Sequence, residues 1–89
     1  MTIELDIEAV VHSIETAFSP LRCVVEVFDY EHRLRFRVFD QKDEAVLTMS
    51  EALMRRLQDS GGFKTIISEC RAQVEHKGYK LDSWNGPSA

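Results

Sequence analysis

Apolar residues near the start of the chain recur at the spacing of an amphipathic helix. Intervals of three and four positions place such residues on one face of an α-helix. Thr2 or Asp6 is the expected N-terminal cap. Pro20 ends the helix, because proline disfavours the helical conformation at Ser19 and has no backbone N–H to donate. The apolar face consists of Ile7, Val10, Val11, Ile14, Ala17 and Phe18.

The period then changes from about 3.6 to 2, which is typical of β-strands. Three runs alternate between two faces, at residues 23–28, 34–39 and 45–49. Short polar stretches join them, and three strands with short connections predict an antiparallel meander. In the first hairpin we expect Asp29 opposite Leu34, a register that sets Glu26 opposite Arg37.

The last third of the chain returns to helical spacing. Thr48 and Glu51 resemble a capping box, with Ser50 as a rival cap, for a short helix that contains Leu53, Met54 and Leu57 and ends at Gly61-Gly62. A final helix is expected over residues 63–77, stopped by Gly78.

The resulting fold class is α+β, with the order α-β-β-β-α-α and a three-stranded antiparallel sheet whose helices pack on one face. We assign residues 1–78 to a single domain and expect 79–89 to form a loosely ordered C-terminal tail, since periodicity is lost there.

Length and charge narrow the classes of function. A chain of 89 residues with a net charge of −4 is one small domain with one thin core. Seven acids and one base in residues 1–31 give that segment −6, whereas residues 32–89 carry +2. This asymmetry permits head-to-tail self-association and argues against strong polyanion binding.

No apolar run approaches the roughly 20 residues of a membrane span, and the acidic start is unlike a secretory signal. We therefore expect a cytoplasmic protein with no membrane contact.

The residues that usually carry chemistry do not form a recognisable site. His12, His32 and His76 fall in different elements without ligand spacing, so we expect no metal. Cys23 and Cys70 alternate in phase with core residues and are expected to be buried free thiols rather than nucleophiles. We accordingly expect no catalytic residues and no cofactor.

The stretch SGGFKT, residues 60–65, has glycines before a lysine at a helix start, but it lacks the full spacing of a phosphate-binding loop. A double-glycine link between two helices is the favoured interpretation.

The second face of the predicted sheet is unusually apolar for a solvent-facing surface. Aromatic residues and arginine on such a face are typical of protein interfaces. The alternative is that the last helix or the segment around Trp84 covers it. We take this face as the candidate interaction surface of a non-enzymatic protein-binding or regulatory module, which binds a partner protein or forms a homodimer. Its candidate residues are Val24, Phe28, Arg35, Arg37, Phe39 and Val46.

Two other function classes stay open. The order α-β-β-β-α is that of the double-stranded RNA-binding domain, which places a lysine cluster at the start of the helix after strand three. Here that predicted helix starts Ser50-Glu51-Ala52-Leu53, and we expect nucleic acid not to be the partner. A small-ligand binder or enzyme is the third class.

One stretch carries a family resemblance. Residues 15–23, ETAFSPLRC, resemble the E-x-x-F-x-P-L-x-C pattern near the N-terminus of a family of short pseudomonad proteins grouped as a domain of unknown function. In that family the motif precedes strand-like segments and a helical C-terminal region. The chain departs at Val25, where members of that family often have a second cysteine. The resemblance implies a bacterial cytoplasmic setting and no catalytic residues.

Overall fold

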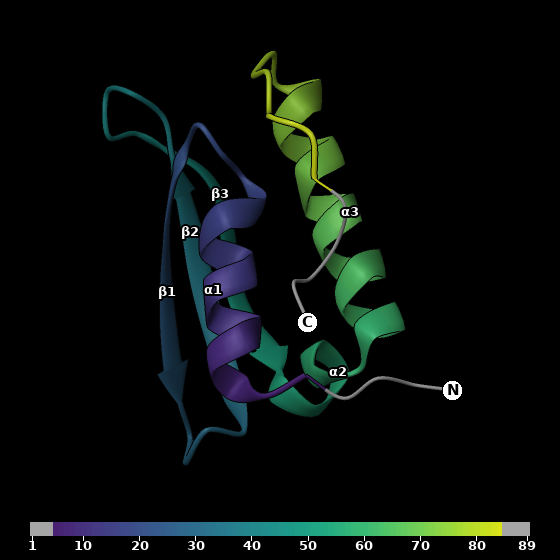
Figure 1. The fold of residues 1–89 in the computed structure, drawn as a ribbon. Coiled ribbons are helices and arrows are strands. Elements are labelled where there is room, and N and C mark those ends of the chain that lie inside the picture. The colour runs from purple at the N-terminus through teal and green to yellow at the C-terminus, as the bar shows by residue number, and fades with distance from the viewer. Residues whose placement is uncertain (1–4, 85–89) are drawn as a thin grey trace.

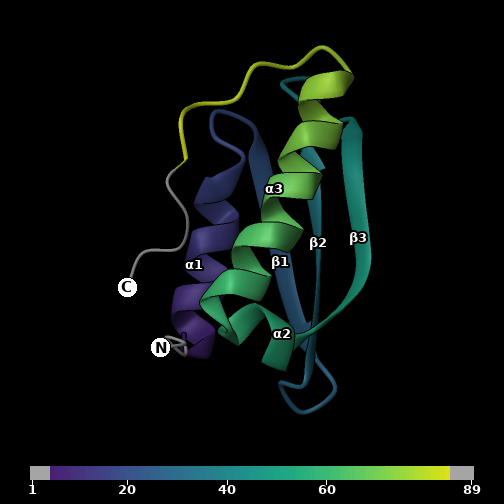
Figure 2. The ribbon, with the colours of Figure 1, turned by 90° about the vertical axis from the view of Figure 1, so that its right-hand side faces the viewer.

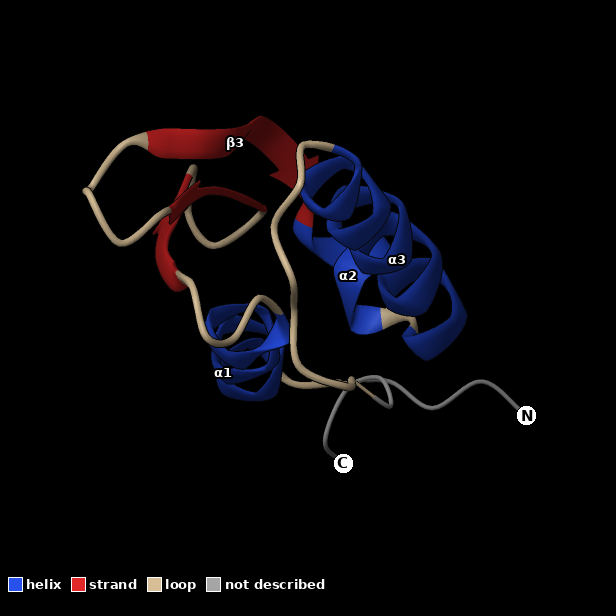
Figure 3. Ribbon diagram, turned by 90° about the horizontal axis from the view of Figure 1, so that it is seen from above, coloured by secondary structure: helices blue, strands red, loops and turns tan. Residues whose placement is uncertain are grey.

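The computed structural model describes residues 5–84 and has the predicted α+β architecture (Figure 1). A three-stranded sheet forms one layer, and the helices lie on one side of it, as the view from above shows (Figure 3). Seen from the helix side, α1 and α3 lie in front of the strands (Figure 2). The elements are α1 (Ile7–Ala17), β1 (Arg22–Phe28), β2 (Arg33–Phe39), β3 (Ala45–Leu53), α2 (Met54–Gln58) and α3 (Ser60–His76).

The first helix begins where one of its two expected caps lies. The Asp6 carboxylate accepts a hydrogen bond of 2.7 Å from the backbone N–H of Ala9, which satisfies one of the donors that a helix start leaves open. Thr2, the other expected cap, lies outside the described residues. The helix ends at Ala17, before Pro20.

The sheet is the predicted antiparallel meander in the order β1-β2-β3, but the expected register of its first hairpin is wrong by two residues. Phe28 pairs with Arg33, and Glu26 pairs with Arg35 instead of Arg37. Asp29, Tyr30 and Glu31 all have positive φ, at 55°, 52° and 68°. Residues with a left-handed backbone conformation cannot continue a strand, so β1 stops at Phe28. The pair that closes the turn is therefore Phe28 with Arg33 instead of the expected Asp29 with Leu34.

The third strand is longer than predicted, and the expected capping box is not formed. Thr48 pairs with Arg37 across the sheet, and the Glu51 carboxylate forms an ion pair with Arg33. These residues are therefore part of β3, and α2 begins only at Met54. Register shifts interrupt the β2–β3 ladder at two places, between Leu34 and Phe36 and between Val38 and Phe39.

The final helix starts three residues earlier than predicted. The Asp59 carboxylate accepts a 2.8 Å hydrogen bond from Gly62 N–H, so the two glycines lie in the first turn of α3 and not in a linker. A Cβ atom on Gly62 would lie only 2.6 Å from the Arg56 carbonyl oxygen, so the approach of α2 to α3 requires glycine there. Gly78 follows the helix with φ of 100°, as expected of a glycine stop.

The core lies between the sheet and the helices. Phe18, at the end of α1, packs on Phe36 of β2 with ring centroids 5.7 Å apart. Leu21 and Cys23 are buried at the corner that leads into β1. The fully buried large side chains are Phe18, Phe36, Phe63, Ile14, Leu34, Leu57, Ile67, Val10, Val38 and Val74.

Residues 79–84 have no regular secondary structure but are packed on the body of the domain, where a loosely ordered tail was expected. Tyr79, Leu81 and Trp84 contact the core cluster. Arg71 of α3 donates hydrogen bonds to the carbonyl oxygens of Ala17 and of Asp82 (the latter 2.7 Å), and so joins α1, α3 and this segment. Residues 85–89 of the predicted tail lie outside the described residues.

Candidate functional site

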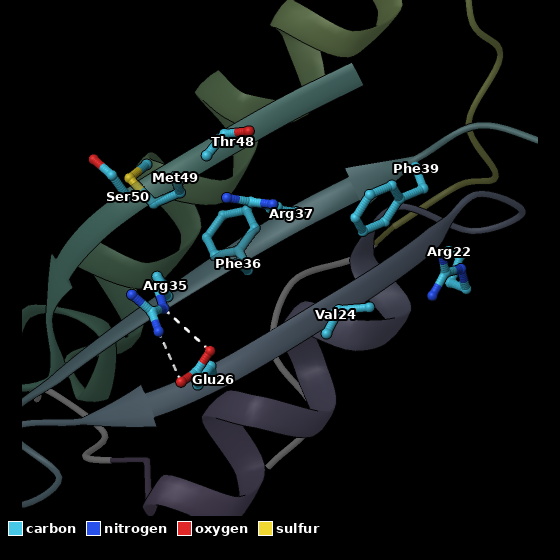
Figure 4. Close-up of a pocket in the computed structure, with 10 residues that line it drawn as sticks. All are labelled: Arg22, Val24, Glu26, Arg35, Phe36, Arg37, Phe39, Thr48, Met49 and Ser50. Atoms are coloured by element: carbon cyan, nitrogen blue, oxygen red, sulfur yellow. Dashed lines mark hydrogen bonds and ion pairs between the residues drawn. The ribbon is translucent and has the colours of Figure 1, made fainter. Parts of the chain in front are cut away.

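The candidate site is the face of the sheet that points away from the helices, which we call the outer face (Figure 4). It comprises Arg22, Val24, Glu26 and Phe28 of β1, Arg33, Arg35, Arg37 and Phe39 of β2, and Thr48 and Ser50 of β3.

Within residues 5–84, nothing covers the outer face. Val24 is 46% exposed, although it is a valine in the middle of a strand. Arg35 and Arg37 are exposed, and Phe28 and Phe39 are half-buried. Trp84, the expected alternative cover, lies on the helix side instead, with its ring 6.0 Å from that of Phe63 in α3. Five of the six predicted surface residues are therefore on the outer face.

Val46 is the exception, and its assignment to the outer face was wrong. It is only 5% exposed and belongs to the core cluster. The register shift beside it pairs Val38 with Leu47 and Phe39 with Ala45, so Val46 is an extra residue in the ladder. A β-bulge of this kind reverses the alternation of side chains, which turns Val46 inward and leaves Ala45 exposed.

Five residues of the outer face were not among the six predicted interaction residues: Arg22, Glu26, Arg33, Thr48 and Ser50. Arg22 was placed outside the first strand, although extending the alternation of Val24 and Glu26 back by two positions puts it on the same face. Ser50 was considered only as a rival cap to Thr48, whose spacing from Glu51 resembles a capping box. Only the pairing of β3 with β2 reveals its position.

Most of the arginines on the outer face are neutralised by nearby carboxylates. Arg35 donates two hydrogen bonds to Glu26, of 2.8 and 3.1 Å, and its guanidinium lies 5.3 Å from the Phe28 ring centroid. This pairing lowers the pKa of the Glu26 carboxyl, chiefly through the hydrogen bonds from Arg35. Arg22 lies 3.1 Å from Asp43 and stacks 4.6 Å from the centroid of Phe39.

Arg33 is neutralised in the same way. It is 3.2 Å from Asp29 and also forms an ion pair with Glu51. Because all these pairs are exposed, each contributes little to stability, but together they determine which positive charges remain on the face.

Arg37 is different, since no carboxylate of the described residues pairs with it. Its cross-strand neighbours are Val24 on β1 and Thr48 on β3, so it occupies the middle of the central row of the sheet. Figure 4 shows it at the centre of the surrounding side chains. A shallow depression of about 470 Å³ lies over this part of the sheet. Its lining combines the Arg37 cation with the apolar surfaces of Val24 and Phe39 and the hydroxyls of Thr48 and Ser50.

The two cysteines are buried free thiols, as the strand and helix phases predicted. Burial, with a smaller effect from Glu15, raises the pKa of the Cys23 thiol to about 12. Burial also raises the pKa of the Cys70 thiol, to about 11. The thiolate is the nucleophilic form, so neither side chain is activated for attack.

We expect both thiols to resist modification in the folded protein at pH 8, where roughly one Cys70 side chain in a thousand is ionised. Reaction with a chromogenic disulfide reagent should be very slow in buffer and complete quickly in denaturant. Because unfolded thiols ionise near 9.0 and the folded ones only at higher pH, stability should fall as the pH rises above about 9. Rapid modification of the folded protein at pH 8 would contradict the expected resistance of the two thiols.

The remaining candidates for chemistry lie apart from the outer face or from one another. His12, His32 and His76 are all exposed, in α1, the first hairpin turn and the end of α3. Within residues 5–84 no three histidine, cysteine or acidic side chains gather in a way that could hold a metal ion. No helix in this part of the chain has both the length and the apolar character needed to cross a membrane.

Comparison with models of protein families, with curated proteins and with solved structures gave no match for this chain.

Proposed function

We propose that this chain is a non-enzymatic protein-binding module that acts through the outer face of its sheet. The observation that carries the proposal is that this face combines an exposed valine, two half-buried phenylalanines and exposed arginines without any cover from the described chain. Arginine and aromatic residues are enriched in the cores of protein interfaces. The two free, buried thiols are consistent with a reducing compartment, and we propose the cytoplasm.

A partner protein suits the face better than a second copy bound face to face. A symmetric pair centred on this face would bring Arg37 of one copy close to Arg37 of the other, and like charges at an interface are unfavourable. Homodimerisation through the outer face is nevertheless a distinct result of the experiment below, because it would appear as a crosslinked dimer of the chain.

The experiment places a photoreactive benzoylphenylalanine at Val24 in cells that produce the protein. We expect irradiation to give a covalent adduct with a partner polypeptide, and none when the same group replaces the exposed Ser68 on α3. The double variant Phe28→Asp/Phe39→Asp should lose the adduct while the helical circular-dichroism signal is unchanged. Tyr30→Asp, which alters an aromatic residue that is 92% exposed in the hairpin turn, is the matched control and should retain the adduct.

Absence of any adduct at Val24, or equal adducts at Val24 and Ser68, would count against a binding role for the outer face.

A nucleic-acid-binding module is the second candidate, because the helix after β3 does not begin where the sequence suggested. The short helix α2 contains the exposed pair Arg55 and Arg56, whereas Ser50 and Glu51 belong to β3. A net charge of −4 makes this candidate the weaker of the two. The oligonucleotide measurement described below tests it.

A further inference from the structure

The outer face leaves one positive charge without a partner among the described residues. Arg22, Arg33 and Arg35 each have a carboxylate of this chain within ion-pair distance. Arg37 has none, although it lies at the centre of the face. A guanidinium presents five N–H donors in a planar fork that matches a carboxylate with two parallel hydrogen bonds.

The surroundings of Arg37 are divided between apolar and polar groups. Val24 lies beside Arg37 on β1, and Phe39 follows two positions later on β2 itself. Thr48 and Ser50 lie on β3, on the other side of Arg37 (Figure 4). The hydroxyls of Thr48 and Ser50 also line the depression over Arg37. An apolar side chain next to a carboxylate on Arg37 finds apolar contacts on Val24.

We propose that the partner of the outer face presents an acidic segment, in which an aspartate or glutamate pairs with Arg37 and a neighbouring apolar side chain packs on Val24 and Phe39. This inference rests on the proposed function and names the chemistry of the partner. The ion pairs of the face select it: Arg22, Arg33 and Arg35 already have carboxylates of this chain within ion-pair distance, so Arg37 is the guanidinium left for a carboxylate of the partner.

The same charge argument separates an acidic peptide from a nucleic acid. Nucleic-acid binding draws its affinity from many cations that neutralise successive phosphates. Here one arginine is available on the face, and the chain as a whole carries −4. A local acidic segment can approach Arg37 without requiring an extended basic surface.

The test uses phage that display random dodecapeptides, selected on the immobilised full-length protein. We expect the selected peptides to contain aspartate or glutamate next to an apolar residue. Synthetic copies should bind the Arg37→Gln variant about tenfold or more weakly, the loss expected for one charge-assisted pair. Their affinity should also fall with added salt.

Arg55→Gln is the matched control, because it removes one exposed arginine and changes the net charge equally, but on α2. It should leave peptide affinity unchanged. A single-stranded oligothymidylate is measured in parallel and is expected not to compete with the peptides. Competition that depends on Arg37 would show a phosphate site on the outer face instead and would overturn the acidic-peptide inference. Oligothymidylate binding that is lost in Arg55→Gln would place nucleic acid on α2 and would support the second candidate function.

The inference also fails if the selected peptides are neutral or basic, if no peptide is selected, or if Arg37→Gln and Arg55→Gln weaken binding equally. These results can be distinguished from failure of the proposed function, which the crosslinking experiment at Val24 tests separately. A partner adduct at Val24 together with peptide binding that ignores Arg37 would preserve a protein-binding face and remove only its preference for acidic segments.

Discussion

Replacing Phe18 by alanine is expected to lower the free energy of unfolding by about 4 kcal/mol, which is most of the stability of a typical small domain. The Phe18 side chain is fully buried and packs on Phe36, so the substitution leaves a cavity between α1 and the sheet. Phe18 also holds the corner through which the chain passes from α1 to β1. Urea denaturation followed by circular dichroism measures the loss.

Phe39→Ala is the matched control for this prediction. It removes the same ring, but from a half-buried position on the outer face where its described ring contact is the Arg22 guanidinium. We expect a loss of about 1 kcal/mol or less, the usual size of an exposed cation–π contact. If the two variants lost stability equally, the corner at Phe18 would not be the packed centre that the structure indicates.

The second prediction concerns two adjacent glycines that should respond in opposite directions to the same change. In a helix, alanine is generally favoured over glycine by roughly 0.5–1 kcal/mol. Gly61→Ala should therefore be neutral or slightly stabilising, because its nearest contact, 3.5 Å from an Asp59 carboxylate oxygen, is an ordinary one. Gly62→Ala should destabilise by about 2 kcal/mol, because the new methyl group would lie 2.6 Å from the Arg56 carbonyl oxygen.

The difference in urea midpoint between these two variants is the quantity to measure, because both start from glycine in the first turn of α3. Equal and favourable shifts would mean that α2 and α3 do not meet as closely as described. Equal and unfavourable shifts would indicate instead that the whole first turn requires glycine.

The order of elements could be predicted from the sequence because each apolar period extends over several residues. The helix around Val10 and Ile14 and the strand around Leu34, Phe36 and Val38 have one face that is fully buried, so their patterns are clear. The bulge at Val46 could not be predicted in this way. An inserted residue changes the phase of the alternation without changing the composition of the strand.

The boundary between β3 and α2 was mispredicted because two local signals competed. Thr48 and Glu51 have the spacing of a capping box, but cross-strand pairing with Arg37 and Arg33 occupies them instead. Such a choice depends on contacts with a strand that lies more than ten positions earlier. Local spacing does not contain that information.

Arg37, the central residue of the site, was predicted to lie on the outer face, but its lack of a carboxylate partner was not predicted. The expected register paired Glu26 with Arg37, which would have neutralised it. The observed register pairs Glu26 with Arg35 and leaves Arg37 available. Both registers keep the same residues on the same face, so alternation could not distinguish them. The positive φ angles at Asp29, Tyr30 and Glu31 fix the register.

The position of Trp84 decides how this protein can be followed by fluorescence. It is the sole tryptophan of the chain, and its indole lies beside Phe63 and 5.8 Å from the Arg71 guanidinium. Its emission therefore reports whether residues 79–84 remain docked on the helices. The sheet separates it from the outer face, so a peptide bound over Arg37 should leave the emission spectrum unchanged. Unfolding and partner binding can consequently be read as separate signals from the same sample.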